Sequence, residues 1–266
     1  MISPYTRNYS HPKIFLLKSS LRFVSHFFLW GILLFIVNGC SPVYLLSHHP
    51  QLSEKVFELK VNRALRKAEK NPLNSTILLE AQTRLTQYGY TFQLEIGDRE
   101  IYEDYLASKQ VYSEASKSFS NALVLGKNAL RNRYPEIDYW LLNPGKIKIN
   151  FEIKHIPNLY WTAASIGGLI KAGKGSAETI VLLPQVGLLL STALKLDPSW
   201  GNGSIYTALI SYTMAEFQVS KAKKEKVKFY FEEAVRLSNG TDAGTFVAYA
   251  ESVSIKNQDK NEFINC

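Results

Sequence analysis

The segment Gly168–Ser176, with the sequence GLIKAGKGS, comes closest in this chain to a motif that performs chemistry. A phosphate-binding loop reads Gly-x-x-x-x-Gly-Lys followed directly by Ser or Thr, because backbone N–H groups hold the phosphates and the hydroxyl binds magnesium. Here Gly175 takes the place of the hydroxyl residue. The motif must also follow a strand, whereas residues 157–170 have the pattern of a helix. We therefore expect a loop between helices, and an envelope enzyme or NTPase built on this segment is the alternative.

A cluster of lysines between residues 221 and 228 could bind nucleic acid. Val227, Phe231 and Ala234 recur in the same stretch at helical spacing, so the pattern predicts a helix with its lysines on the solvated face. Glu225 also interrupts the cluster. We expect no nucleic-acid partner. The lysines are Lys221, Lys223, Lys224, Lys226 and Lys228.

Other reactive side chains lack the partners that catalysis or metal binding needs. His48 and His49 are adjacent and His155 stands alone, with no Cys or second His at ligand spacing on a helix. The chain has no Gly-x-Ser-x-Gly elbow. We expect no catalytic residue, no metal and no cofactor, and hence a protein that is not an enzyme.

Composition sets the class of chain that must position these groups. The 266 residues are 46% hydrophobic and 20% charged, which indicates a globular protein rather than a disordered one. Two cysteines are too few for a disulfide scaffold. Half of the net charge of +8 comes from residues 1–39, which contain four basic residues and no acidic one.

Residues 27–37 form an apolar run that follows these basic residues. The run has the length of a signal-peptide core and is shorter than the roughly 20 residues of a membrane-spanning helix. The run ends at Val37, which together with Gly39 and Cys40 resembles the lipobox of bacterial lipoproteins, where the cysteine thiol is acylated. Asn38 departs from that pattern. The resemblance implies that Cys40 carries a lipid anchor.

The predicted organisation follows from this signal. We expect a cleaved signal peptide at 1–39, a lipidated N-terminus and linker at 40–55, and a helical domain at 56–266. An uncleaved signal anchor is the alternative, and both place the domain in the cell envelope facing the periplasm. Ser41 favours the outer membrane under the enterobacterial sorting rule.

Apolar residues recur at helical spacing along the rest of the chain, as in Val186, Leu189, Leu190 and Ala193. Residues 146–154 alternate instead, and we expect an extended connector there because no second run could pair with it. Turn signals separate the helical segments. They are Asn71-Pro72, Gly97-Asp98, Asn143-Pro144-Gly145, Asp197-Pro198 and Asn239-Gly240.

The helices contain an irregular repeat. Val186, Leu190, Ala193 and Pro198 have the spacing of the second helix of a tetratricopeptide repeat and its closing proline. Val227, Phe231 and Ala234 repeat the first three positions 41 residues later. The small alanines would let adjacent helices approach closely. The fold class we predict is all-α, an irregular tetratricopeptide-like α-solenoid of helix pairs.

Three sequence blocks carry a family resemblance. Together with the lipobox-like end, they resemble the TatT family, tetratricopeptide-repeat lipoproteins associated with TRAP transporters, over nearly all of residues 40–266. The resemblance implies a non-enzymatic scaffold that forms trimers, docks the periplasmic solute-binding subunit and carries a hydrophobic ligand through a pore or groove. The blocks are Leu159-Tyr160-Trp161, Leu196-Asp197-Pro198-Ser199-Trp200-Gly201-Asn202-Gly203 and Tyr249-Ala250-Glu251-Ser252-Val253.

The family pattern continues past the last block with a further helix, whereas this chain stops at Cys266. We therefore expect the C-terminal helix to be cut short, which would leave the last apolar face without its cap. A tetratricopeptide lipoprotein of another envelope complex is the alternative function. Aromatic residues within the resembling segments are the candidates for ligand or partner binding, with core packing as the other interpretation. They are Tyr88, Tyr160, Trp161, Trp200 and Tyr206.

Overall fold

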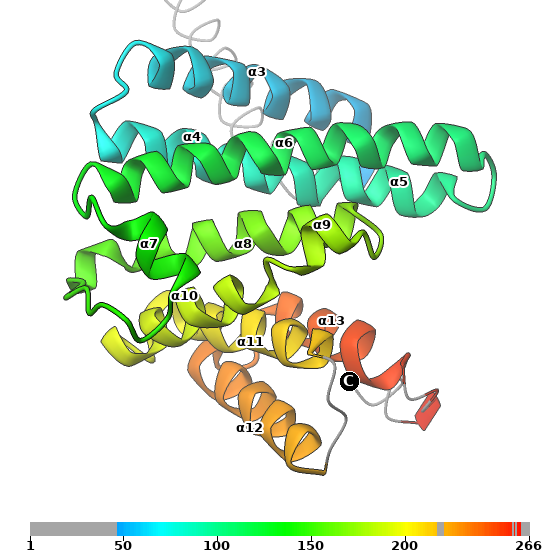
Figure 1. Cartoon of the computed structure of the whole chain (residues 1–266). Coiled ribbons are helices and arrows are strands. Elements are labelled where there is room, and N and C mark those ends of the chain that lie inside the picture. Colours follow the sequence, from blue (N-terminus) through cyan, green and yellow to red (C-terminus); the bar gives the residue numbers. More distant parts are fainter. Residues whose placement is uncertain (1–46, 217–220, 257, 259, 262–266) are drawn as a thin grey trace, which may run out of the picture. The chain divides into compact units, whose positions relative to one another are not determined.

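A computed structural model of the chain describes residues 47–216, 221–256, 258, 260 and 261 (Figure 1). Internal contacts divide the chain into a unit of residues 1–56 and a unit of residues 57–266. In the first unit the described part holds the start of helix α3 (Pro50–Glu69). The predicted signal peptide, Cys40 and the expected shortened end at 262–266 lie outside the described residues, so these remain predictions.

The second unit begins with helices that stack on one another. Helices α4 and α6 lie side by side and both pack on α8, which packs on α10 in turn (Figure 1). Polar caps start two of them: Asn74 Oδ1 accepts from the N–H groups of Thr76 and Ile77, and Asp104 Oδ1 accepts from Ala107 N–H. The elements of this part are α4 (Ser75–Tyr88), the π-helical turn η1 (Gly89–Leu94), α5 (Glu95–Glu100) and α6 (Tyr105–Arg131).

The turn predicted at Gly97-Asp98 is wrong. The chain continues through α4, η1 and α5 without a break, and it reverses only at residues 101–104. Gly97 is buried there, and a Cβ added to it would lie 2.9 Å from Cε1 of Tyr112. This glycine therefore permits close packing of α5 on α6 rather than a reversal of the chain.

The connector after α7 is extended at residues 148–152, as its alternating pattern predicts, whereas the last residues of the predicted stretch belong to the 3-10 turn Ile153–His155. Within the described part of the chain no strand forms, and Pro144 and Ile147 make an isolated bridge. The alternation instead places Phe151 in the core, with its ring centroid 5.1 Å from that of Trp140 and 4.7 Å from that of Tyr134. The elements around it are α7 (Ile137–Leu142), the single turn η2 (Ile153–His155), α8 (Ile156–Ala172), α9 (Ala177–Ile180) and α10 (Leu183–Leu196).

The C-terminal elements pack around α11. Gly203 lets α12 approach the start of α11 closely, because a Cβ on this residue would lie 2.9 Å from Ala234 Cα. Gly203 also has a φ of +95°, a left-handed conformation that glycine adopts without strain. The elements are η3 (Trp200–Gly203), α11 (Ser204–Ala215), α12 (Lys221–Ser238), α13 (Ala243–Tyr249) and the π-helical turn η4 (Ala250–Ser254).

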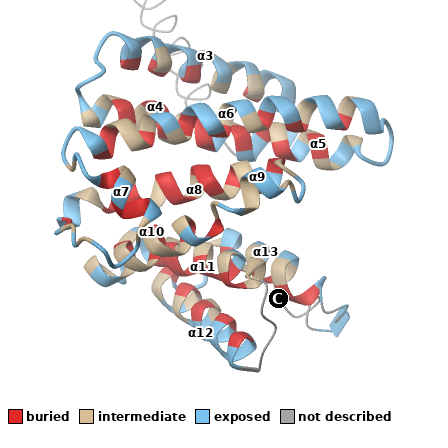
Figure 2. Cartoon of the chain, in the orientation of Figure 1, coloured by how far each residue is buried: buried red, intermediate tan, exposed pale blue. Residues whose placement is uncertain are grey.

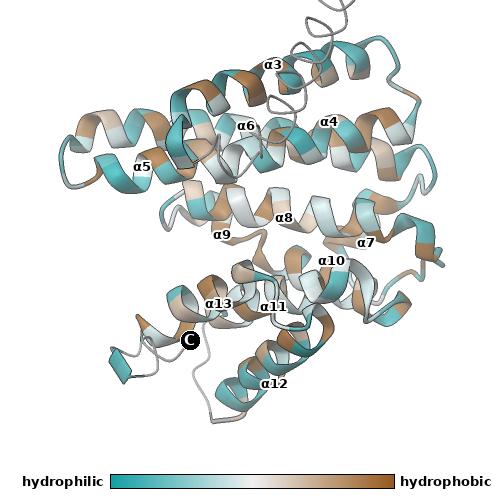
Figure 3. Cartoon of the chain, turned by 180° about the vertical axis from the view of Figure 1, so that it is seen from behind, coloured by the Kyte–Doolittle hydropathy of each residue, from teal (hydrophilic) through white to brown (hydrophobic). Residues whose placement is uncertain are grey.

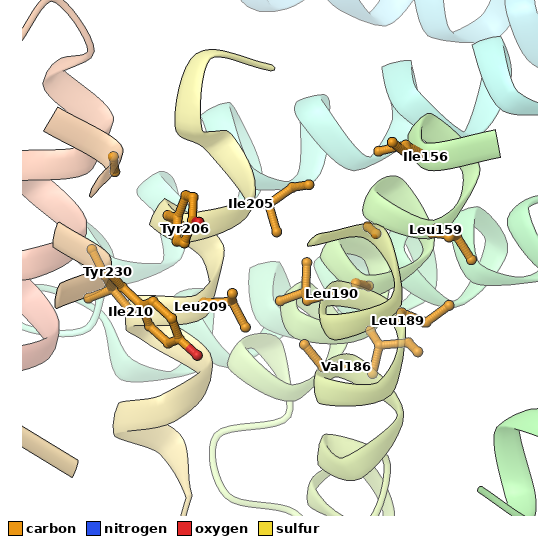
Figure 4. Close-up of a cluster of buried hydrophobic side chains, with 14 of the residues drawn as sticks. Ile156, Leu159, Val186, Leu189, Leu190, Ile205, Tyr206, Leu209, Ile210 and Tyr230 are labelled. Atoms are coloured by element: carbon orange, nitrogen blue, oxygen red, sulfur yellow. The ribbon is translucent and has the colours of Figure 1, made fainter. Parts of the chain in front are cut away.

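The main core joins α8, α10 and α11. Figure 2 shows the buried residues as stripes on the facing sides of these helices, and Figure 4 shows the side chains that meet between them. The predicted stripe Val186, Leu189, Leu190 and Ala193 is buried in this core. The fold is thus all-α, as the periodicity predicts. The assignment of tetratricopeptide repeats stays a prediction.

One apolar stretch could cross a membrane on length and composition alone. It is Ala177–Leu196, found in a search of the described residues. Leu189 and Ala193 within it are fully buried in the core of this unit.

A second point of close packing lies on α6. The Phe119 ring is fully buried between Gly89 and Gly168, and a Cβ on Gly168 would overlap that ring. Gly126, two helical turns further along α6, contacts Gln82 of α4 and Thr162 of α8 in the same way. Gln82 is fully buried, and its Nε2 donates to Thr162 Oγ1 at 3.2 Å.

Candidate functional site

The glycine-rich segment lies at the C-terminal end of α8. Gly168 is inside the helix, and the residues from Gly173 to Ser176 form the loop that leads to α9. The helix end presents carbonyl groups and the negative end of the helix dipole, which disfavours a phosphate. The segment follows a helix and connects two helices, as predicted, and it lacks the geometry of a phosphate-binding loop.

The lysine of this segment is held by an acidic partner. Lys174 Nζ donates to Asp98 Oδ1 at 3.0 Å and lies 3.8 Å from the ring centroid of Tyr112, whose hydroxyl also donates to Asp98. Partial burial raises the pKa of Asp98, but the hydrogen bonds from Tyr112 and Lys174 outweigh it and hold the pKa below its ordinary value. Lys174 therefore joins the α8 end to α5.

The lysine cluster mostly forms a solvated face, as predicted. Lys224, Lys226 and Lys228 are exposed on α12, and Figure 3 shows the hydrophilic side of this helix. Lys223 departs from the prediction because it is 9% exposed. Its Nζ donates to the carbonyl oxygen of Glu216 at 2.6 Å, at the C-terminal end of α11, where a cation is favourable.

Three of the predicted aromatic residues come together. The ring centroid of Tyr160 lies 5.3 Å from that of Trp161 on α8 and 5.0 Å from that of Trp200 on η3. All three rings are half-buried, so they combine mutual packing with accessible surface. Burial raises the pKa of Tyr160, and the charge of Asp242 at the start of α13 adds to the shift.

Tyr90 extends this group, and the sequence analysis did not select it as a site residue. It lies on η1, and its hydroxyl donates to the carbonyl oxygen of Ala164 on α8 at 3.1 Å. Desolvation of this hydroxyl raises its pKa, while 38% of the residue stays exposed. We call Tyr90, Tyr160, Trp161 and Trp200 the aromatic row. Small residues at helical spacing after Trp161, namely Ala164 and Gly167, were the signal that a ring packs across this face of α8.

The other two candidates lie elsewhere. Tyr206 of α11 is 7% exposed and packs on Tyr230 of α12 at 5.8 Å between ring centroids. Tyr88 ends α4 and packs on Phe92 at 5.5 Å. Both of these contacts are local packing between helices or along one continuous helical stretch.

The second unit has a large and a small cavity that bear on function. The larger has a volume of about 920 Å³ and lies where the start of α10 meets the end of α11. Apolar side chains such as Val181 and Leu183 share its wall with Lys223 and Lys226 of α12. The smaller cavity, of about 230 Å³, lies between the end of α6 and the start of α8. In the parts of the chain that the structure describes, no group of three or more His, Cys, Asp or Glu could hold a metal ion.

The family follows from a sequence comparison. Residues 51–266 match the family model of the TRAP transporter T-component, so the chain belongs to this family. The protein is therefore an accessory component associated with a TRAP transporter, and with the cell envelope. A search of curated proteins finds no match to the chain.

Proposed function

We propose that the protein is a lipid-anchored periplasmic scaffold that docks the solute-binding subunit of its TRAP transporter through the aromatic row. The single observation that carries this proposal is the exposure of that row. The rings of Tyr160, Trp161 and Trp200 meet between α8 and η3 and stay partly accessible, and the partly exposed Tyr90 is hydrogen-bonded to α8 through Ala164. Tyr and Trp are enriched at protein interfaces, where they supply large apolar area with few rotatable bonds.

The proposed anchor and assembly rest on the sequence and the family. Cys40 would carry the lipid, and two or more acyl chains give stable attachment. Ser41 favours the outer membrane as the site of attachment. The family resemblance supports a homotrimer. A scaffold for another envelope complex is the alternative, and it predicts the same anchor with a different partner.

Docking can be tested with the full chain in detergent and the solute-binding subunit of the same transporter. Light scattering should show a rise in mass on mixing with the wild type. Trp200→Ala should weaken the association by at least about tenfold, because a hot-spot aromatic contributes about 2 kcal/mol or more. Tyr102→Ala is the matched control, since Tyr102 is 92% exposed on the turn between α5 and α6.

The two variants give a clear decision. Equal loss of binding in Trp200→Ala and Tyr102→Ala would remove the aromatic row from the proposal. A wild-type chain that is folded by circular dichroism and gains no mass would refute docking of this subunit and favour the alternative envelope partner.

We also propose that the cavity of about 920 Å³ holds a hydrophobic ligand. Its volume falls within the range of small-molecule sites, and its apolar wall with a few polar groups is typical of them. A fluorescent apolar probe should bind the wild type and lose affinity in Leu183→Gln, which places an amide in the wall. Unchanged affinity in this variant would exclude the cavity as the ligand site.

A further inference from the structure

The smaller cavity, of about 230 Å³, lies at the N-terminal end of α8, opposite to the glycine-rich loop. An apolar cavity of about 150 Å³ is enough to bind benzene, so this cavity has room for a ring-sized molecule. Apolar and polar side chains share its wall. The lining residues used below are Leu73, Leu130, Arg133, Lys154, His155 and Asn158.

One buried donor in this wall has no partner. Asn158 is 6% exposed, and its Nδ2 makes no hydrogen bond within the described residues. A buried amide donor without a partner costs about 1–3 kcal/mol, so such groups are uncommon in folded proteins. The neighbouring polar groups are already used: Ser75 Oγ donates to the carbonyl of Ala129, and Asn132 Nδ2 donates to the carbonyl of Pro72.

The charges around the cavity favour an anion. Arg133 and Lys154 line it, and both form ion pairs with Glu152, at 3.1 and 2.8 Å. Two cations and one carboxylate leave one net positive charge. Partial burial lowers the pKa of His155, which disfavours a further positive charge on this ring.

The helix end adds a second favourable field. Asn158 lies in the first turn of α8, and no side chain caps this end of the helix. Ile156 N–H is bonded to the carbonyl of Ile153, and Pro157 has no N–H, so the backbone offers few free donors here. The positive end of the helix dipole still stabilises negative charge near the first turn. The Asn158 side chain supplies the donor that the backbone lacks.

We propose that this cavity binds a small free carboxylate, with its oxygens between Asn158 and Arg133 and its apolar part against Leu73 and Leu130. A single negative charge matches the net charge of the site. The guanidinium group of Arg133 can hold a carboxylate through two parallel hydrogen bonds. Arg133 and Lys154 already hold the Glu152 carboxylate, which shows that both side chains can bind this group.

The test uses the full chain in detergent and para-fluorobenzoate, observed by fluorine NMR. Para-fluorobenzamide is the neutral control of the same shape. We expect saturable broadening of the benzoate signal, no matching effect on the amide, and displacement by acetate. Inorganic phosphate that displaces the probe as well as acetate does would overturn the choice of a carboxylate.

Variants locate the binding. Asn158→Leu should weaken it by at least about tenfold, because the buried donor is lost. Arg133→Gln should weaken it by about fivefold. Arg133 has a largely exposed side chain, so this variant keeps the test valid if Asn158→Leu does not fold. Lys148→Gln removes an exposed charge from the same connector and should have no effect.

Three results would overturn the proposal. They are no broadening of para-fluorobenzoate by the wild type at millimolar concentration, equal broadening of benzoate and benzamide, and equal weakening by Arg133→Gln and Lys148→Gln. The proposal does not depend on docking to the solute-binding subunit, so either one can fail alone.

Discussion

The two ends of α8 differ in chemistry, and in the direction opposite to what their residue types suggest. The C-terminal end carries the glycines and lysines that suggest a phosphate loop, yet its lysine is paired with Asp98 and its backbone presents carbonyl groups. The N-terminal end carries no recognisable motif, yet it has a cavity, a buried unpaired amide and a net positive rim.

This difference shows that the direction of a helix outweighs the residue types at its ends. A glycine-rich loop binds anions when it precedes a helix, because the N–H groups and the dipole then face the ligand. The same residue types after a helix meet the opposite field. The glycines after α8 end the helix and turn the chain, and Gly175, with a φ of +88°, is one that this turn requires.

The largest expected effect concerns the glycine that begins the motif-like segment. Gly168→Ala should destabilise the protein by about 3 kcal/mol, because the new methyl group would overlap the buried Phe119 ring. Thermal unfolding should show a decrease in Tm of roughly 6–10 °C for a unit of this size.

The neighbouring glycine is the matched control for this prediction. A Cβ on Gly167 would lie 3.2 Å from Tyr90 Oη and meet nothing else nearby. Gly167→Ala should therefore stay within about 0.5 kcal/mol of the wild type, since the gain in helix propensity offsets a small shift of Tyr90. Equal loss in both variants would mean that helix α8 needs flexible residues here, not space for Phe119.

The second effect concerns the N-terminal end of α8. Asn158→Leu should raise the free energy of unfolding of the unliganded protein by about 1 kcal/mol, because it removes a buried donor that has no partner. Chemical denaturation measures this change. A clear loss of stability would contradict it and would show that the amide supports the fold instead of a ligand.

The smallest effect concerns Asp98 at the other end. Its folded-state pKa is lower than in the unfolded chain, so its contribution to stability is present at neutral pH and is lost as the pH falls through the folded value. Asp98→Asn should lower the free energy of unfolding by about 1 kcal/mol at pH 7. This loss is smaller than for a buried ion pair, because the Asp98 side chain is 40% exposed.

The pH dependence provides the check on Asp98. The stability difference between wild type and Asp98→Asn should be constant between about pH 6 and 8 and shrink below about pH 4. A difference that persists undiminished at pH 3 would show that the amide disturbs packing around Tyr112 and that charge pairing contributes little.

The sequence predicted those parts that depend on periodicity alone. On α10 one side chain in every three or four faces the core, and this spacing is visible in the sequence. In the extended connector every second side chain does so. The role of Gly97 could not be predicted, because the sequence does not distinguish a glycine that turns the chain from one that makes room for the Tyr112 ring. The Asn158 cavity also escaped prediction, since its wall joins α6 and α8 across the long connector.

The aromatic row lies between these cases. The sequence blocks identified Tyr160, Trp161 and Trp200 as a group, and the structure brings them together. Tyr90 belongs with them through its hydrogen bond to the backbone of Ala164, and the small residues Ala164 and Gly167 of α8 leave room for it there. Tyr206 is also aromatic but does not join this group, because it lies on α11 and packs on Tyr230 of α12.

The Phe119 ring and Gly126 fix α6 at two points, two turns apart, against both α4 and α8. A single such point would allow one helix to pivot on its neighbours, whereas two prevent both rotation and sliding. Helices α4, α6 and α8 should therefore move as one rigid lever. Any bending that accompanies partner binding would then have to occur outside these three helices.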